Sequence, residues 1–160
     1  MNYVKAPKTA LPMAFTLTTG KKYAGKVNRV KEYHYLLVKL LQSYKHMYSN
    51  FEICLEIFDD GYRETKLHYH GYMFVNKDMV YQYSKFLAEW EKKSKTSMTV
   101  SKKVYNDKWE EYIHKHDIIS LTYSKLKLRR WITPGNIKDI HKWSKPDAEG
   151  IEAFMNAQNK

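Results

Sequence analysis

The chain has 160 residues, with 28 lysines and arginines against 17 acidic residues and a formal net charge of +11. This length suits one domain with its own core, and the composition excludes a repeat array and a disulfide scaffold. A basic chain with 15% aromatic residues favours a polyanionic partner, nucleic acid first; a solvated basic surface is the alternative. Residues 1–31 carry seven basic side chains and no acidic one.

Cys54 is the single cysteine, so no intramolecular disulfide can form, and a reducing compartment is expected. Its setting in FEICLEIF predicts a buried strand residue without a catalytic role. The first ten residues lack the apolar segment of a signal peptide, and no apolar stretch approaches the roughly 18 residues that span a bilayer. We therefore expect an intracellular protein with no membrane partner.

The first half of the chain predicts a strand, a helix and a hairpin. The run MAFTLTT at 13–19 has strand composition between a proline and a glycine. Apolar residues at three-and-four spacing from Tyr33 onward predict an amphipathic helix. The runs FEICLEIF at 51–58 and LHYHGYMFV at 67–75 then predict two strands joined in an antiparallel hairpin.

The second half of the chain continues the alternation of predicted strands and helices. Helical spacing returns over 79–90, with Asn76 or Asp78 as the expected cap. The alternating run at 97–105 predicts an edge strand, and a short helix is expected from about Asp107 to His116.

A fifth strand is expected within IISLTYSKLKLRRW, and a last helix near residues 147–157. This order predicts an α+β fold in which helices cover one face of an antiparallel sheet.

His68 and His70 stand two residues apart on a predicted strand, so both side chains point to the same side, about 7 Å apart. The residues between and after them form an apolar set that suits a core, which leaves the histidines on the uncovered face. Glu52 and Glu56 share one face of the neighbouring strand and offer a carboxylate. Two imidazoles and a carboxylate would make an open metal site; exposed polar or structural histidines are the alternative.

The predicted helix at 107–116 brings Tyr112 and Lys115 onto one face, because they are three residues apart. Trp109 and Ile113 could anchor this helix to the sheet while Tyr112 faces outward. A cation or metal near Tyr112 would help to hold a phenolate, although packing or surface exposure is the ordinary role of a tyrosine. His114 and His116 diverge around the helix and are expected to face solvent, with contact between either one and DNA as the alternative.

The runs FTLTT, HYHGYMF and WEEYIHK occur in that order, with Glu56 between the first two. This series resembles the HUH endonuclease domain of rolling-circle replication initiators, most closely the Rep proteins of circular single-stranded DNA viruses and related plasmids. The resemblance covers residues 13 to about 120. Thr18 and Thr19 depart from the asparagines that often follow FTL in that family.

For the fold, the resemblance implies a five-stranded antiparallel sheet of ferredoxin-like or RRM-like type, with helices packed mainly on one face. It implies an HUH domain over 1–120 and a C-terminal extension or linker with a helix over 121–160. The helicase domain of viral Rep proteins is expected to be absent, since no glycine-rich phosphate loop occurs.

For the site, the resemblance implies that His68, His70 and Glu56 bind a divalent ion, Mg²⁺ or Mn²⁺, with Glu52 and Glu64 as alternative carboxylates. Tyr112 corresponds to the nucleophile and Lys115 to the lysine of the third motif. Thr and Lys side chains near the open face are the expected DNA contacts: Thr16, Thr18, Lys21, Lys22, Lys102 and Lys103.

The implied activity is sequence-specific cleavage and joining of single-stranded DNA at a stem-loop origin, which starts rolling-circle replication. A helicase domain or protein is a further expected partner, and the location would be a host nucleus or a cytoplasm. A transposase or plasmid relaxase of the same chemistry and a non-catalytic RRM-like nucleic-acid-binding module are the alternatives.

Overall fold

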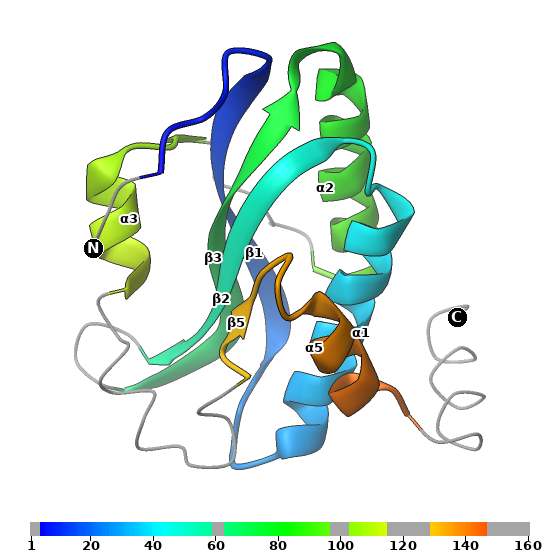
Figure 1. The fold of residues 1–160 in the computed structure, drawn as a ribbon. Coiled ribbons are helices and arrows are strands. Elements are labelled where there is room, and N and C mark those ends of the chain that lie inside the picture. The colour runs from blue at the N-terminus through cyan, green and yellow to red at the C-terminus, as the bar shows by residue number, and fades with distance from the viewer. Residues whose placement is uncertain (1–3, 59–62, 97–102, 115–128, 147–160) are drawn as a thin grey trace.

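The computed structural model describes residues 4–58, 63–96, 103–114 and 129–146. Within these residues, helices and strands alternate along the chain, and Figure 1 shows their arrangement. In chain order they are β1 (Ala10–Lys22), α1 (Val27–Ser43), β2 (Tyr48–Phe58), β3 (Glu64–Asn76), the 3-10 turn η1 (Lys77–Met79), α2 (Val80–Ser94), β4 (Lys103–Val104), α3 (Asp107–His114), β5 (Trp131–Ile132) and α5 (Ile137–Ser144).

The strands hydrogen-bond in the order β4-β1-β3-β2-β5, and every neighbouring pair is antiparallel. The long strands β1 and β2 both pair with β3, which is therefore central. The short strands β4 and β5 add two residues each at the two edges. The expected α+β class and the antiparallel sheet are confirmed.

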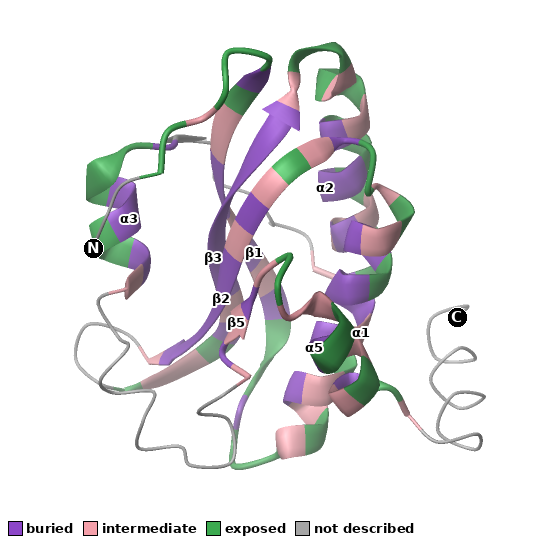
Figure 2. Ribbon diagram, in the orientation of Figure 1, coloured by how far each residue is buried: buried purple, intermediate pink, exposed green. Residues whose placement is uncertain are grey.

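One face of the sheet carries the larger apolar core, beneath α1, α2 and α5 (Figures 1 and 2). The apolar residues of α1 recur at three-and-four spacing and are buried on one side, as the sequence predicts. They meet alternate residues of the central strands, such as Leu17, Ile53 and Tyr69. Ile132 of β5 and Ile140 of α5 belong to the same core, so residues 129–146 of the expected extension pack onto it.

The opposite face carries a second buried cluster beneath α3, which lies apart from the other helices in Figure 1. Trp109 and Ile113 of α3 pack with strand residues such as Cys54 and Tyr72. The burial of Cys54 agrees with its predicted place in a strand. The expectation that the histidine face is uncovered is wrong in part, because α3 lies on it.

Several boundaries differ from those predicted. The first helix starts at Val27, before the predicted Tyr33. Neither Asn76 nor Asp78 caps α2, since its N-terminal cap is Met79 without a side-chain bond. The amide of Asn76 instead donates to the backbone carbonyl of His46.

The C-terminal elements also differ. Of the expected edge strand at 97–105, residues 103–105 are described, and Lys103–Val104 form β4; the strand expected after Asp117 is found at Trp131–Ile132. Helix α5 was not predicted, and the helix expected at 147–157 lies outside the described residues. In the part of the chain that is described, no helix combines the length and apolar composition that crossing a bilayer requires.

Candidate active site

Strand pairing brings Glu56, His68 and His70 onto one face of the sheet. Glu56 of β2 lies directly opposite His68 of β3 in the register, and Cys54 lies opposite His70. Side chains on directly opposed residues of an antiparallel pair point to the same face. As the sequence predicts, the histidines therefore lie on one face of the sheet, and Leu67 and Tyr69 lie in the core on the other face.

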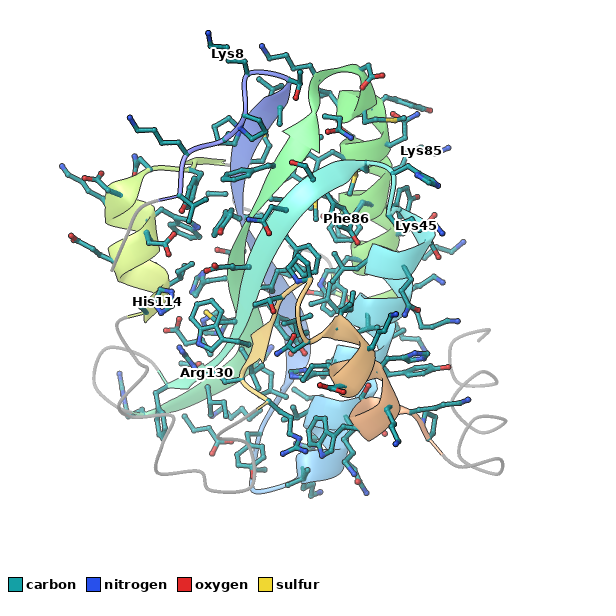
Figure 3. All side chains as sticks on the ribbon, in the orientation of Figure 1. Lys8, Lys45, Lys85, Phe86, His114 and Arg130 are labelled. Atoms are coloured by element: carbon teal, nitrogen blue, oxygen red, sulfur yellow. The ribbon has the colours of Figure 1, made fainter. Side chains whose placement is uncertain are left out.

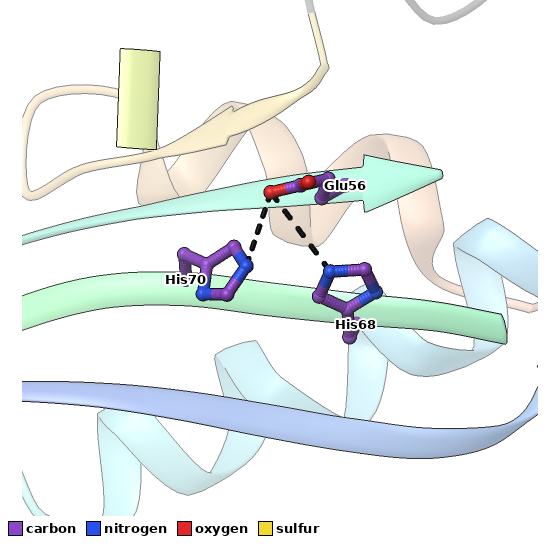
Figure 4. A group of neighbouring side chains, drawn as sticks. All are labelled: Glu56, His68 and His70. Carbon is purple, nitrogen blue, oxygen red and sulfur yellow. Dashed lines mark ion pairs between the residues drawn. The ribbon is translucent and has the colours of Figure 1, made fainter. Parts of the chain in front are cut away.

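The three side chains converge on one oxygen (Figure 4). Oε2 of Glu56 lies 3.0 Å from Nε2 of His70 and 3.8 Å from Nε2 of His68. The two imidazole rings are nearly perpendicular, with centroids 4.9 Å apart. Glu56 is 4% exposed and His70 is 5% exposed, whereas His68 is partly open to solvent. The cluster is thus a partly buried site with one open side.

The other ring nitrogen of each histidine is held by a hydrogen-bond partner. Nδ1 of His68 lies 2.9 Å from the carbonyl oxygen of Lys66, which can only accept, so Nδ1 donates. Nδ1 of His70 lies 2.9 Å from the hydroxyl of Thr16. In a neutral ring that donates through Nδ1, the lone pair is on Nε2, the atom that faces Glu56. For His68 this is the tautomer typical of metal-ligating histidines, and the Thr16 hydroxyl can accept from Nδ1 of His70 in the same way, so the donor set suits a divalent ion.

Tyr112 lies against this cluster. Its ring centroid is 5.1 Å from that of His70, and its ring stacks on Trp109 at 5.3 Å. As the sequence predicts, Trp109 and Ile113 are buried and Tyr112 faces outward, with 40% of its surface exposed. The indole of Trp109 donates to the carbonyl of Gly71, which joins the helix directly to the backbone that follows His70.

Gly71 permits a close approach between β2 and β3. A Cβ at this position would lie 2.7 Å from the backbone oxygen of Glu52 and 2.9 Å from a side-chain carbon of Ile53. No alanine or larger residue fits there without moving the strands. The glycine next to His70 is therefore a packing requirement of the strand that carries both histidines.

Glu56 is the carboxylate that the structure brings to the histidines. Glu52 lies instead beside Glu110 and His114. Glu64, the third carboxylate considered, accepts a hydrogen bond from the backbone of Ala24. Lys115 lies outside the described residues.

The residues expected to contact DNA lie in different surroundings. Thr16 contacts His70, and the hydroxyl of Thr18 lies 3.3 Å from that of Thr96. Lys21 and Lys22 are exposed at the end of β1. Lys103 lies in β4, and Lys102 lies outside the described residues.

The sequence did not predict a second cluster, formed by Glu52, Glu110 and His114. The prediction that His114 faces solvent is wrong, because its side chain is 17% exposed and its ring stacks on Trp131 at 4.2 Å. Figure 3 shows His114 at the C-terminal end of α3. The available signal was the four-residue spacing of Glu110 and His114, which places both on one helix face. His116 lies outside the described residues.

Burial and nearby charge favour the protonated forms of Glu52 in this cluster and of Tyr105 beside it. Burial, and then the nearby charge of Glu110, raise the pKa of Glu52. Burial and a hydrogen bond to Glu110 raise the pKa of Tyr105, so its hydroxyl keeps its proton and donates to the carboxylate. Two carboxylates therefore disfavour each other's charge between β2 and α3.

Comparison of the chain with family models, with curated proteins and with solved structures finds no match in any of the three. What the site does must be argued from its own geometry.

Proposed function

We propose that this chain is a metal-dependent nickase and joining enzyme for single-stranded DNA, of the HUH type, which starts rolling-circle replication. One observation carries the proposal: an outward-facing tyrosine, Tyr112, lies against His70 of a Glu56, His68 and His70 cluster. A tyrosine beside a site suited to a divalent ion is the arrangement that transfer of a phosphoryl group to a phenol requires.

The order of elements supports the same proposal. The segment from β1 to β4 runs strand, helix, strand, strand, helix, strand, and β3 lies between β1 and β2. This is the split arrangement of ferredoxin-like domains. We infer that the chain has the ferredoxin-like or RRM-like fold of HUH enzymes, with β5 as an added edge strand. In this fold the site lies on the face of the sheet opposite α1 and α2.

The reaction exchanges one phosphate ester for another. A divalent ion held by Glu56, His68 and His70 would polarise the scissile phosphate and offset the charge of its transition state. The phenolic oxygen of Tyr112 attacks phosphorus and gives up its proton to solvent, to which it is exposed. The bond from phosphorus to the 3′ oxygen breaks, and that oxygen takes a proton. The products are a free 3′-hydroxyl and a 5′-phosphotyrosine, and attack by another 3′-hydroxyl reverses the step and joins ends.

Other residues hold the reacting groups. Trp109 stacks on the Tyr112 ring and hydrogen-bonds to the Gly71 carbonyl, so it limits where the phenol can lie. Lys115, three residues after Tyr112, is proposed to orient the phosphate. The exposed Lys21 and Lys22 are proposed to contact the DNA backbone, which predicts binding that weakens as salt rises.

The test is covalent capture of DNA. The protein is incubated with Mn²⁺ and a labelled single-stranded oligonucleotide that contains a stem-loop, and adducts are resolved on a denaturing gel. We expect a labelled protein band that disappears in Tyr112→Phe. The matched control is Tyr81→Phe, which removes the hydroxyl of an exposed tyrosine on α2 and should leave the band unchanged.

Two results would contradict the proposal. If Tyr112→Phe retains the adduct, another residue is the nucleophile. If a panel of stem-loop substrates gives salt-sensitive binding without any adduct, the chain is a non-catalytic nucleic-acid-binding module.

A further inference from the structure

The second titratable cluster joins the sheet to the helix that carries Tyr112. Glu52 comes from β2, whereas Glu110 and His114 lie on successive turns of α3. Nε2 of His114 is 3.6 Å from Oε1 of Glu110 and 4.0 Å from Oε2 of Glu52. One donor atom from each residue lies within 4.8 Å of the other two.

The two carboxylates of this cluster lie close together and away from water. Glu110 is 4% exposed and Glu52 is half-buried, so both carboxylates have lost much of their water. Among the described residues, the basic side chain within 4.0 Å of either carboxylate is His114. Each carboxylate disfavours the charge of the other at this partly buried position, and a cation bound between them would offset that repulsion.

Each donor is oriented by a neighbouring side chain. Tyr105 donates to Oε2 of Glu110, which leaves Oε1 directed toward His114. The ring of His114 is held by stacking on Trp131. Supporting contacts of this kind around the donors are typical of metal sites.

A buried hydroxyl provides a separate indication of a ligand. Tyr72 is fully buried, and its hydroxyl is beside Glu52 and Tyr105. This hydroxyl interacts with Glu52 and Tyr105, but within the described residues neither contact is a hydrogen bond of normal geometry. A buried polar group is rarely left in this state, and a water molecule bound to a cation at Glu52 would supply the missing partner.

We propose that Glu52, Glu110 and His114 form a second divalent-cation site that fastens α3 to β2. Two carboxylates and an imidazole suit a transition-metal ion such as Mn²⁺ or Zn²⁺ better than Mg²⁺. Donor atoms about 2.0–2.2 Å from one ion lie about 3.0–3.5 Å from each other. The observed separations of 3.6 and 4.0 Å therefore close by small side-chain rotations.

The ion would position the nucleophile's helix and take no part in the reaction. Tyr112 lies between Glu110 and His114 in the sequence of α3, and its ring points to the other cluster, toward His70. Binding at this second site can be tested whether or not the chain cleaves DNA, because the two clusters share no residue.

The experiment measures how many metal ions the wild type and its variants bind. The full chain, stripped with a chelator, is titrated with Mn²⁺ alone and then Zn²⁺ alone by calorimetry, and the Mn²⁺ signal is followed by electron paramagnetic resonance. We expect two ions in the wild type and one in the His68→Ala, His70→Ala double variant. Adding Glu52→Gln to that double variant should weaken the remaining site at least about tenfold.

Glu52 is the residue to change because it is the most exposed of the three, and Glu52→Gln keeps the size of the side chain. A second variant, His114→Gln, should act in the same way. Thermal unfolding in the presence of a chelator verifies that both variants fold. The proposal is overturned if the double variant binds neither metal, or if Glu52→Gln and His114→Gln both leave its binding unchanged.

Discussion

On one face of β3, Leu67, Tyr69 and Val75 pack beneath α1 and α2, whereas on the other face His70 and Tyr72 meet the side of α3. The two faces are built from alternate residues of the same strand, and both are well buried. The two faces differ in the partners of their buried polar atoms.

On the α1 and α2 face, the buried His34 is satisfied by ordinary partners. Nε2 of His34 donates to the carbonyl of Arg129, and Nδ1 accepts from the hydroxyl of Tyr69 at 2.7 Å. On the α3 face, carboxylates and imidazoles of several elements point at shared positions instead. The first arrangement completes a core, and the second offers donor atoms to a ligand; four predictions test this difference.

The largest expected effect follows from removing both imidazoles of the α3 face. The His68→Ala, His70→Ala variant should lose DNA cleavage by about 10³-fold or more, because the ion that stabilises the transition state has lost two ligands. Most of the salt-sensitive DNA binding should remain, as measured by fluorescence anisotropy at two salt concentrations. His46→Ala, at an exposed histidine, is the control. Cleavage that survives in the double variant would show that the metal assignment is wrong.

The second prediction concerns the imidazole of the other face. Burial lowers the pKa of His34 to about 4, against an ordinary 6.5, although the bond to Arg129 opposes this. Between these values the unfolded chain binds a proton that the folded chain excludes, so stability falls as pH decreases from 6.5 toward 4. The loss from this residue is about 3 kcal/mol at most.

Denaturant unfolding between pH 7 and 4.5 would measure this loss. His34→Gln should flatten the dependence on pH, whereas His46→Gln, at an exposed site, should keep the wild-type slope. Identical slopes in all three proteins would contradict the assignment of a neutral, buried His34.

The third prediction concerns the close approach of β2 and β3. Gly71→Ala should destabilise the fold by about 2 kcal/mol, because the added Cβ meets backbone at 2.7 Å. Gly20→Ala is the matched control, since nothing lies within 4 Å of a Cβ there. Chemical denaturation compares the two variants, and equal stability would mean that the strands separate easily.

The smallest expected effect concerns the positioning of Tyr112. Trp109→Phe keeps an aromatic ring but loses the hydrogen bond to Gly71, so adduct formation should slow by about tenfold. Single-turnover rates measure this effect. Trp143→Phe, on α5 at the other face, should leave the rate unchanged. A normal rate in Trp109→Phe would show that stacking alone positions the phenol.

Much of the first cluster could be predicted because strand alternation is a local property. His68 and His70 alternate with apolar residues on their strand, as Glu56 does on the preceding strand. This alternation is enough to place the three side chains on the face opposite the apolar core. The choice of Glu56 over Glu52 could not be made from the residues alone, since it depends on the register between β2 and β3.

Long-range packing explains what the sequence did not predict. The angle between His114 and His116 around the helix favours exposure of both, but the burial of His114 depends on Trp131, which is far along the chain. Helix α5 is short, and its burial of Ile140 depends on the core beneath α1. Such contacts join residues that are far apart in the sequence, so the pattern of about ten neighbouring residues does not predict them.

Tyr69 helps to fix the register in which β3, the strand that carries both histidines, pairs with its neighbours. Its hydroxyl bonds to His34, and its ring packs edge-on against Trp90 at 5.8 Å, both on the helix side of the sheet. A slip of one residue in the pairing of β3 would turn Tyr69 outward and bury two imidazoles in an apolar layer. The misaligned hairpin would lose a hydrogen bond and gain two desolvated rings. The residue between the histidines thus makes the correct alignment the stable one.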